Sequence, residues 1–263
     1  MKKQSAISRL FLAITLTVSV YISPVLAAES KRIAVYGASG RIGQVIVLEA
    51  LERGYVVTGL SRKPDKLEFK HKNFIAEKGD LMDINSIRNI ASKHDAIVIS
   101  VSARATDNKP ENSLLVKFTE NIHKALTGLE NKPYILQVGG ANLMHGSTYD
   151  EIKDNMRKNK LDVPFAFEAG TEMHAVLFGH QISLEMYRDN NLSWTVLAPP
   201  INIRGIYGNL DSTTTKESYR VSKSEVLVDS KGGNSIYVRD LAKAALTEIE
   251  KKEFYRDVFT IGY

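Results

Sequence analysis

Two hydrophobic periodicities alternate along the chain from residue 31 onward. Short apolar runs of strand character are Arg32–Tyr36, Tyr55–Leu60, Asn73–Glu77, Ala96–Val101, Tyr134–Val138, Trp194–Ala198 and Val258–Ile261. The segments between them repeat apolar residues every three or four positions, as amphipathic helices do, and they are Arg41–Arg53, a helix ending at Ile90, Glu111–Leu126, Thr171–Arg188 and Arg239–Glu250. Strands that alternate with helices of this length predict an α/β fold with a doubly wound parallel sheet.

The alternation continues through the sequence without an internal repeat, a low-complexity tract or a linker. We therefore expect a single domain over residues 31–263. The run Ala96–Val101 is apolar throughout, which is typical of a strand buried on both faces. Near the C-terminus we expect a hairpin over Tyr219–Asp229, followed by the last helix and strand.

The segment before residue 31 does not follow this pattern. An uncharged, mostly apolar run, Leu10–Ile22, has the length of the apolar region of a signal peptide. The basic residues before it are Lys2, Lys3 and Arg9. Pro24 and the small residues up to Ala27 then predict a signal peptide over residues 1–27, cleavage after Ala27, and a periplasmic or secreted protein without a stable membrane span. An uncleaved anchor is the alternative, because the whole of Leu10–Ala28 carries no charge.

Composition narrows the classes of function. A hydrophobic content of 43% and a charged content of 25% are typical of globular proteins. The net charge is +5, three of these charges lie in the leader, and no basic stripe alternates with aromatic residues, so nucleic acid is not an indicated partner. The chain has no cysteine, which excludes disulfides, thiol chemistry and cysteine-ligated zinc.

The segment GASGRIG follows the first expected strand and opens the first expected helix. Its glycines let the chain turn sharply and let the backbone approach a pyrophosphate, while the helix N-terminus offers N–H groups and a positive dipole. In this strand–helix–strand context the motif predicts dinucleotide binding at Gly37, Ser39, Gly40, Arg41, Ile42 and Gly43. A tight turn that binds nothing is the structural alternative.

The end of the second strand bears on which dinucleotide would bind. Sites that prefer NAD usually have an acidic residue there for the ribose 2′-hydroxyl, whereas this chain has Ser61, Arg62 and Lys63. Two cations suit a 2′-phosphate, so the sequence favours NADPH over NAD, with a solvated basic turn as the alternative. Asp80, after the third strand, is either an adenine contact or a turn residue before a helix.

Six segments in order resemble one known family: GASGRIG, LSRKPDK, KGDLMD, QVGGANL, SWTVLAPP and GGNSIYVRDLAKAALTEIE. Together they resemble the NAD(P)H-binding branch of the atypical short-chain dehydrogenase/reductases. This branch includes NmrA-like and flavin- and biliverdin-reductase-like proteins, often described as NAD(P)-dependent epimerases/dehydratases. The resemblance covers the chain from about Arg32 to Tyr263 and implies a Rossmann-type fold. Tyr237 departs from it, since a small polar residue is usual there.

A catalytic centre is less clear from the sequence. Short-chain enzymes use a Ser-Tyr-Lys set, and Tyr149 and Lys153 have the Tyr-x-x-x-Lys spacing. However, this pair lies too far upstream of Pro199 for the helix before the sixth strand, and in a polar stretch, so it is a weak candidate for the general acid. The helix that precedes Trp194 has no such pair. The resemblance then implies hydride transfer in which cofactor positioning and solvent protons suffice.

Other polar residues at strand ends are candidates to line the site. Polar or not, these strand-end residues are Ser100, Ser102, Gly139, Gly140, Asn142, Pro199 and Pro200, and we expect ligand contacts, or turn chemistry, at them. His174 and His180 lie six apart on one helix and point to different faces, so with Glu172 they do not predict a metal site. His180 could instead line the pocket. Phe165 and Phe167 either cap a planar substrate or pack on the core.

These observations lead to one main hypothesis and one alternative. The main hypothesis is an exported NADPH-binding oxidoreductase that transfers hydride to a small, planar substrate. The alternative is a non-catalytic NAD(P)-binding sensor or interaction protein on the same fold, which the missing Ser-Tyr-Lys set favours. A sugar-nucleotide epimerase is a weaker third hypothesis, because that chemistry normally needs the tyrosine. The sequence leaves the substrate and the oligomeric state open.

Overall fold

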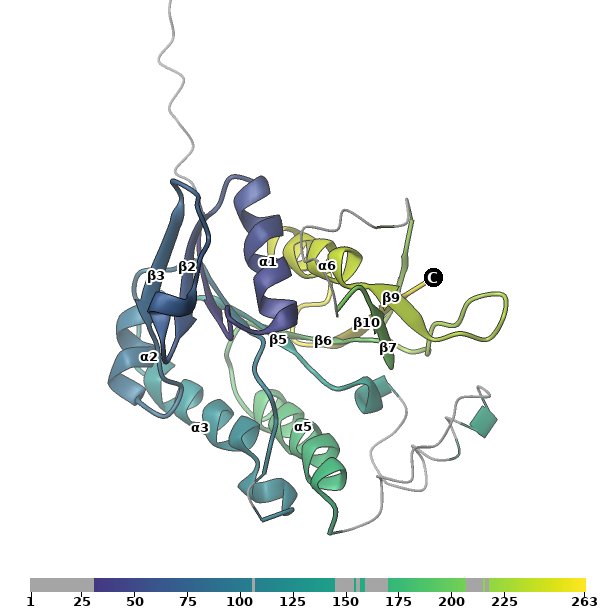
Figure 1. Ribbon diagram of the computed structural model, residues 1–263. Coiled ribbons are helices and arrows are strands. Elements are labelled where there is room, and N and C mark those ends of the chain that lie inside the picture. Colours follow the sequence, from purple (N-terminus) through teal and green to yellow (C-terminus); the bar gives the residue numbers. More distant parts are fainter. Residues whose placement is uncertain are drawn as a thin grey trace, which may run out of the picture.

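The central feature of the fold is an eight-stranded sheet with the strand order β3-β2-β1-β4-β5-β6-β10-β8 (Figure 1). The computed structural model describes residues 31–105, 107–144, 154, 157–158, 170–206, 215 and 218–263. The strands of the sheet are β1 (Arg32–Tyr36), β2 (Val56–Ser61), β3 (Phe74–Lys78), β4 (Ala96–Ile99), β5 (Tyr134–Val138), β6 (Trp194–Ala198), β8 (Arg220–Ser222) and β10 (Val258–Gly262). All neighbours pair in parallel except β8, which is antiparallel to β10. The expected α/β fold with a doubly wound parallel sheet is confirmed.

Helices cover both faces of this sheet (Figure 1). Those on one face are α1 (Arg41–Glu52) and α6 (Val238–Lys251), and those on the other are α2 (Ile84–Ala91), α3 (Leu114–Leu126) and α5 (Glu172–Arg188). Three short 3₁₀ helices are η1 (Pro64–Lys66), η2 (Pro110–Asn112) and η3 (Ala141–Met144). Each face buries its own hydrophobic cluster, one centred on Val45, Ile46 and Leu241 and the other on Ile87, Ile122 and Trp194.

Side-chain caps determine where three of the helices begin. Asp83 Oδ1 accepts a hydrogen bond from Asn85 N at 2.9 Å before α2, and Ser113 and Thr171 cap α3 and α5 in the same way. Such caps satisfy N–H groups that have no partner inside the helix. The helix expected from Glu111 therefore starts later, at Leu114, because η2 and the Ser113 cap precede it.

The strand β4 is buried along its whole length, as its apolar sequence predicts. It lies between β1 and β5, with helices on both sides, so neither of its faces meets water. The strand ends at Ile99 rather than at Val101. Ser100 N still donates to Tyr36 O at 3.0 Å, and the chain then leaves the sheet beside the turn that follows β1.

The expected hairpin over Tyr219–Asp229 is not formed as such. That segment contributes one strand, β8, whose partner is β10 rather than a second strand within the segment. The structure also has a small parallel pair that the sequence did not predict, made of β7 (Asn202–Arg204) and β9 (Ser235–Tyr237). Such short strands carry no recognisable periodicity, and their partners are selected by tertiary contacts.

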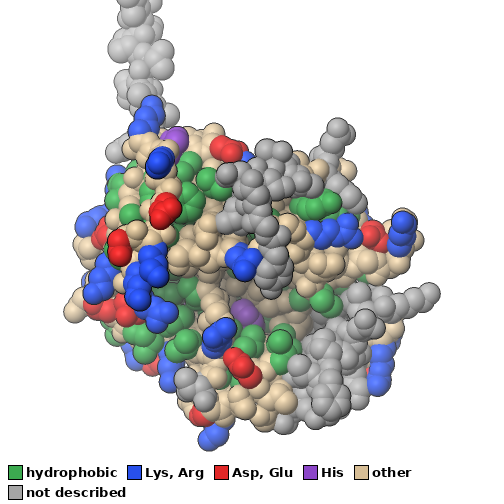
Figure 2. All heavy atoms as spheres, viewed as in Figure 1, with side chains coloured by type: hydrophobic (Ala, Val, Ile, Leu, Met, Phe, Trp, Pro, Cys, Tyr) green, Lys and Arg blue, Asp and Glu red, His purple; other side chains and the backbone are tan. Residues whose placement is uncertain are grey.

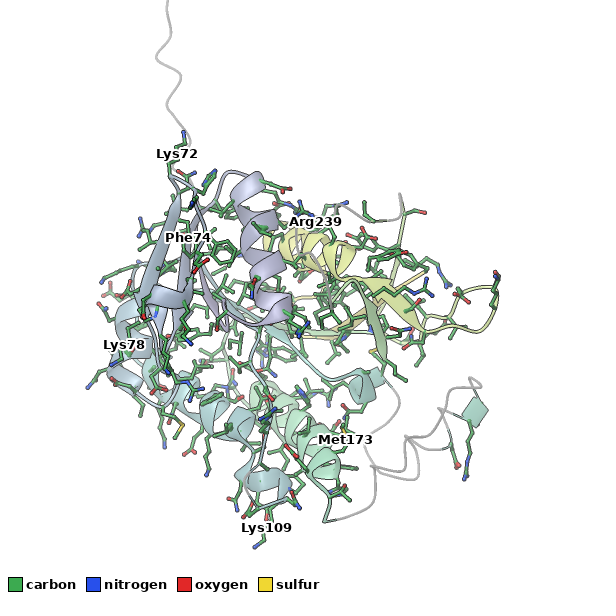
Figure 3. The ribbon with its side chains drawn as sticks, in the orientation of Figure 1. Lys72, Phe74, Lys78, Lys109, Met173 and Arg239 are labelled. Atoms are coloured by element: carbon green, nitrogen blue, oxygen red, sulfur yellow. The ribbon has the colours of Figure 1, made fainter. Side chains whose placement is uncertain are left out.

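Charged side chains fasten α1 to α6 on one face of the sheet. Arg239 of α6, which is labelled beside α1 in Figure 3, pairs its Nε with Glu49 Oε2 at 3.2 Å and also contacts Glu52. Arg53 Nε pairs with the other oxygen of Glu49 at 2.8 Å. Glu49 is nearly fully buried, so its charge is compensated from two directions. This network holds α1, and hence the turn that precedes α1, in a fixed position.

Phe74 of β3 packs on the same face (Figure 3). Its ring lies against Gly59 of β2, where a Cβ atom would stand 2.7 Å from the ring.

Within the described residues, we find no helix long and apolar enough to cross a membrane.

Candidate functional site

The turn between β1 and α1 contains three glycines, and each allows a different close backbone contact. Gly37 has a φ of +82° and no room for a side chain, because a Cβ atom there would overlap the carbonyl group of Ser100. A Cβ atom at Gly43 would overlap the carbonyl oxygen of Gly37. Gly40 N donates to Gly37 O at 2.8 Å and closes the turn. The backbone is thus packed on itself and on β4, as a turn that approaches a phosphate requires.

The helix α1 begins directly after this turn, and its first backbone N–H groups have no side-chain cap. Gly40 is the residue that precedes the helix, with an extended backbone, and no side chain caps the helix there. The first turn of α1 also has no acidic residue. A helix N-terminus carries a partial positive charge, and here no carboxylate of the first turn compensates it. The arrangement is suited to an anionic ligand.

A cavity of about 430 Å³ opens beside this helix end, at the carboxyl ends of the parallel strands. The space-filling view shows a hollow with a histidine side chain near the middle of this face (Figure 2). The cavity is lined by the β1–α1 turn, the ends of β4, β5 and β6, α5, and the segment of β7 and the residues just after it. The lining residues are Gly40, Arg41, Ile42, Ser100, Val101, Ser102, Ala103, Val138, Gly139, Val176, His180, Pro199, Ile203 and Ile206. This is the point where the strand order reverses, at which open α/β sheets bind ligands.

The far wall of the cavity is formed by α5, which presents Val176 and His180. These residues are four positions apart and so lie on one face of the helix. His180 is 8% exposed, and burial lowers its pKa to about 4, so its imidazole is neutral at neutral pH. Neither of these two cavity-facing residues of α5 is the lysine that a Tyr-x-x-x-Lys pair would need.

Gly140 lies close to two polar side chains, those of His180 and Asn142. A Cβ atom on Gly140 would stand 2.9 Å from His180 Cδ2 and would overlap Asn142 Oδ1. Asn142 is 2% exposed and donates from Nδ2 to Leu177 O at 3.0 Å, which fixes its amide against α5. Asn142 Oδ1 and His180 Nδ1 are both buried and have no hydrogen-bond partner within the described residues.

The basic segment after β2 lies at the same edge of the sheet as the glycine turn, because Leu60 pairs with Tyr36. Arg62 and Lys63 are exposed there, and Ser61 Oγ accepts a hydrogen bond from Lys63 N at 3.1 Å. These side chains do not line the cavity but flank the strand that leads into the turn. Because Arg62 and Lys63 are exposed at this edge, a ligand on the glycine turn that extended toward β2 would come near both cations.

Asp80 lies one strand further out. Its Oδ1 accepts from Met82 N at 2.9 Å, and its carbonyl oxygen accepts from Asp83 N at 3.1 Å. Asp80 therefore shapes the turn into α2, which is the structural alternative that the sequence offered for it. A second cavity, of about 560 Å³, lies between α1 and residues 66–71, and Ser39 is one of its lining residues.

The structure thus brings together much of the predicted site. One cavity collects the predicted residues Gly40, Arg41, Ile42, Ser100, Ser102, Gly139 and Pro199. Gly37 and Gly43 lie beneath them as backbone supports. Ser39, Ser61, Arg62, Lys63, Asp80 and Gly140 do not line this cavity. Tyr149, Lys153, Phe165 and Phe167 lie outside the described residues.

The sequence missed the apolar part of the cavity wall. Val176 could have been found from its four-residue spacing to His180, whereas Ile203 and Ile206 carried no signal before the chain was folded. Arg41 Nη1 donates to Ile206 O at 3.0 Å and ties this segment to the start of α1. Within the part of the chain that the structure describes, no group of three or more histidine and carboxylate side chains is arranged to hold a metal ion. His174 instead packs against Phe178, with ring centroids 4.5 Å apart.

A glycine turn at the switch point of a doubly wound sheet, opening on an uncapped helix N-terminus, defines the class of Rossmann-type dinucleotide-binding proteins. The chain belongs to the NAD(P)H-binding family, whose model matches residues 37–252. The family and the fold that the sequence predicted are therefore confirmed. At the level of the family, the expectation of an NAD(P)H-dependent oxidoreductase is confirmed with them.

Individual relatives are distant. The chain is 27% identical over 236 residues to the uncharacterised protein YwnB of Bacillus subtilis. The aligned region covers 88% of this chain and 97% of YwnB. Among solved structures, it is similar to a proposed exported protein from Burkholderia pseudomallei, with 25% identity, a TM-score of 0.66, and coverage of 89% of this chain and 100% of that one. It is also similar to a proposed NADH-flavin reductase from Streptococcus pneumoniae, with 24% identity, a TM-score of 0.66, and coverage of 89% and 99%.

Proposed function

We propose that the protein is an exported, NADPH-dependent reductase that transfers hydride to a small planar substrate. The observation that carries this proposal is the glycine turn, in which Gly37 and Gly43 leave no space for a Cβ atom beside an uncapped helix N-terminus. The family supports a nicotinamide cofactor, and one similar solved structure, that of a proposed NADH-flavin reductase, supports a planar acceptor.

In this proposal, the cofactor's phosphates lie on the turn and on the first residues of α1. The residues that would hold them are Gly37, Ser39, Gly40, Arg41, Ile42 and Gly43. Ser61, Arg62 and Lys63 would contact a 2′-phosphate, and Asp80 would lie toward the adenine. Ser100, Ser102, Gly139, Gly140 and Pro199 would border the nicotinamide end. When bound, the cofactor supplies a hydride, and the chain's role is to orient the substrate and limit the access of water.

The preference for NADPH is tested by isothermal titration of the mature protein with NADPH and NADH. We expect tighter binding of NADPH, because two cations near the end of β2 complement the charge of the extra phosphate. The double variant Arg62→Ala/Lys63→Ala should lose at least tenfold in NADPH affinity, equivalent to about 1.4 kcal/mol, and should leave NADH affinity unchanged. Lys72→Ala/Lys109→Ala is the matched control, since both lysines are exposed at opposite ends of the molecule (Figure 3). Equal affinity of the wild type for both nucleotides would contradict the preference, and binding of neither would contradict the proposed function.

Export rests on the predicted signal peptide over residues 1–27, and the relative from Burkholderia pseudomallei that is proposed to be exported supports it. Expression of the full chain in a bacterial host, followed by fractionation and N-terminal sequencing, tests this part. A periplasmic or secreted protein that begins at Ala28 is the expected result. An intact N-terminus in the membrane fraction would instead identify an uncleaved anchor.

A non-catalytic NAD(P)-binding sensor is the second candidate. The observation that favours it is the cavity face of α5, which carries Val176 and His180 and no Tyr-x-x-x-Lys pair. Oxidation of NADPH is measured with a panel of quinones, flavins and aldehydes. Turnover of any of them supports the reductase, and tight cofactor binding without turnover supports the sensor.

A further inference from the structure

The strand β3 forms one edge of the eight-stranded sheet, and within the described residues no other strand lies beyond it (Figure 1). The edge of a sheet presents a row of backbone N–H and C=O groups to which another strand can bind. The middle of β3 is open to such a contact, because Ile75 is 41% exposed and Ala76 is exposed as well. The strand contains no proline, and its pairing with β2 runs without a break from Phe74 to Lys78. This edge is therefore a candidate surface for strand pairing.

The hydrogen bonds between β2 and β3 determine which backbone groups of β3 point outward. Val57 N donates to Asn73 O at 2.8 Å, and Gly79 N donates to Ser61 O at 3.2 Å. Along a strand, residues that bond to one neighbour alternate with residues whose N–H and C=O groups point the other way. Since Asn73 and Gly79 bond to β2, every second residue between them points to the open side. The outward residues are Phe74, Ala76 and Lys78.

These outward groups are complementary to those of a second copy of β3 that runs in the opposite direction. With Ala76 opposite the partner's Ala76, the two residues exchange both of their backbone hydrogen bonds. Lys78 then lies opposite the partner's Phe74, and Lys78 N can donate to the C=O group of that residue. Phe74 N is not needed, because it donates to His71 O of its own chain at 3.0 Å. The strand is thus self-complementary about Ala76.

The charges beside β3 favour this register over the neighbouring ones. Lys72 and Lys78 lie at opposite ends of the strand (Figure 3), and Asp80 follows Lys78 by two residues. With Ala76 opposite its copy, Lys72 faces the partner's Asp80 at each end of the pair. A shift of two residues in one direction would set Lys72 opposite the partner's Lys78, and a shift of two in the other would set Glu77 opposite the partner's Glu77. Opposite charges that face each other across two strands stabilise the pair, and like charges destabilise it.

We propose that the protein forms a two-fold dimer in which β3 pairs antiparallel with β3 of a second copy, with Ala76 at the axis. The two sheets then continue into one another. The exposed side chain of Ile75 lies diagonally across from the partner's Ile75 and gains an apolar neighbour. The contact is short, so the dimer is reversible and depends on protein concentration. This inference goes beyond the proposed reductase function and does not depend on cofactor binding.

Cross-linking tests the register directly, because the chain has no cysteine of its own. We expect Ala76→Cys to form a disulfide-linked dimer when it is oxidised with copper–phenanthroline. Residues opposite each other at a hydrogen-bonded position have Cα atoms about 5.5 Å apart, which a disulfide can span. Lys109→Cys is the matched control, since Lys109 is exposed at the far end of the molecule from Lys72 (Figure 3). Cross-linking of Ala76→Cys that is no faster than that of the control would overturn the proposal.

Sedimentation velocity measures association of the mature protein from low to high micromolar concentration. We expect a concentration-dependent dimer that Ala76→Pro weakens at least tenfold, because proline removes the N–H group at the axis and leaves the ladder with β2 intact. Lys72→Glu should weaken the dimer at least fivefold, since a carboxylate would then face the partner's Asp80. Lys109→Glu should leave the dimer unchanged.

Two outcomes of the sedimentation experiment would overturn the proposal. One is a wild type that stays monomeric at every concentration, and the other is a dimer that neither Ala76→Pro nor Lys72→Glu weakens, which would place the contact on another surface. Circular dichroism identifies a proline variant that does not fold. In that case Lys72→Glu and the cross-linking of Ala76→Cys still decide the matter.

Discussion

Gly37 lies directly against the backbone of Ser100, so that a Cβ atom at Gly37 would overlap the Ser100 carbonyl oxygen and stand 2.8 Å from the carbonyl carbon. This contact joins the β1–α1 turn to the end of β4. It therefore fixes the distance between two sides of the cavity, and it cannot relax, since both partners are backbone.

The first prediction follows from this contact. Gly37→Ala should destabilise the protein by several kcal/mol and abolish nucleotide binding, because the new methyl group must displace β4. Gly54→Ala is the matched control, because Gly54 has the same φ of +82° but no heavy atom within 4 Å of the place that a Cβ atom would take. The control should cost only about 1–2 kcal/mol, which is the penalty of a left-handed backbone for a residue with a side chain. Urea unfolding measures both, and equal losses in the two variants would contradict the steric explanation.

The second prediction concerns the buried hydroxyl of Ser183, which joins three elements on the other face of the sheet. Its Oγ lies 2.7 Å from Thr119 Oγ1 of α3 and accepts from Gln137 Nε2 of β5 at 3.1 Å. Ser183→Ala leaves the Gln137 amide without this acceptor, so we expect a loss of about 1–3 kcal/mol in unfolding free energy. Ser224→Ala, at an exposed position, should change it by less than about 0.5 kcal/mol. A Ser183→Ala variant as stable as this control would show that the network contributes nothing.

The third prediction concerns Glu248, a buried carboxylate that receives several hydrogen bonds. Tyr134 Oη donates to Glu248 Oε1 at 2.7 Å, and Phe254 N donates to the same oxygen at 3.1 Å. Burial raises the pKa of Tyr134, so its hydroxyl remains a donor at all accessible pH values. Glu248→Gln keeps one oxygen but replaces the other, which accepts from Glu253 N at 3.0 Å, with an amide NH2 group, and we expect a loss of about 2–3 kcal/mol in unfolding free energy. Glu120→Gln, at an exposed ion pair, should have little effect on chemical denaturation, and a similar loss in both variants would refute the explanation.

The fourth prediction is a pH dependence of stability that originates at His180. The folded chain holds the pKa of His180 at about 4, below the value of about 6.5 in the unfolded chain. Between these values the unfolded chain binds a proton that the folded chain does not, so stability falls as the pH falls through this window. From pH 7 to pH 5 the loss from this one group amounts to about 2 kcal/mol.

Comparison with His180→Leu isolates this contribution. His94 and His123 also have pKa values lowered by burial, but they are present in both proteins and cancel in the difference. Urea unfolding at pH 7 and pH 5 should show a smaller loss in the variant, by about 2 kcal/mol. Identical pH dependence in the two proteins would mean that His180 titrates normally.

Much of the fold was predictable because the strands and helices of the sheet bury one or both faces, and buried faces carry apolar residues at regular spacing. The strands Arg32–Tyr36, Tyr134–Val138 and Trp194–Ala198 were predicted with their observed bounds. The hairpin over Tyr219–Asp229 was wrong because antiparallel pairing of β8 depends on β10, which lies beyond α6 at the far end of the chain. No local pattern reports such a partner.

The candidate site divides in the same way. The glycine turn was predictable from local spacing, since its steric demands involve neighbouring residues and the strand–helix context. The close approach of His180 to Gly140 was not, because it depends on how closely α5 packs against the end of β5. Likewise, Ile203 and Ile206 reach the cavity through the pairing of β7 with β9, a contact between segments that are distant in the sequence.

By itself, the sequence determined the α/β class, the glycine turn at Gly37–Gly43 and the family, because each depends on short-range spacing of apolar residues and glycines. The tertiary structure alone decided which side chains face the cavity opposite that turn. Helix packing distances and strand order set these positions, and both arise from the whole core rather than from any one segment.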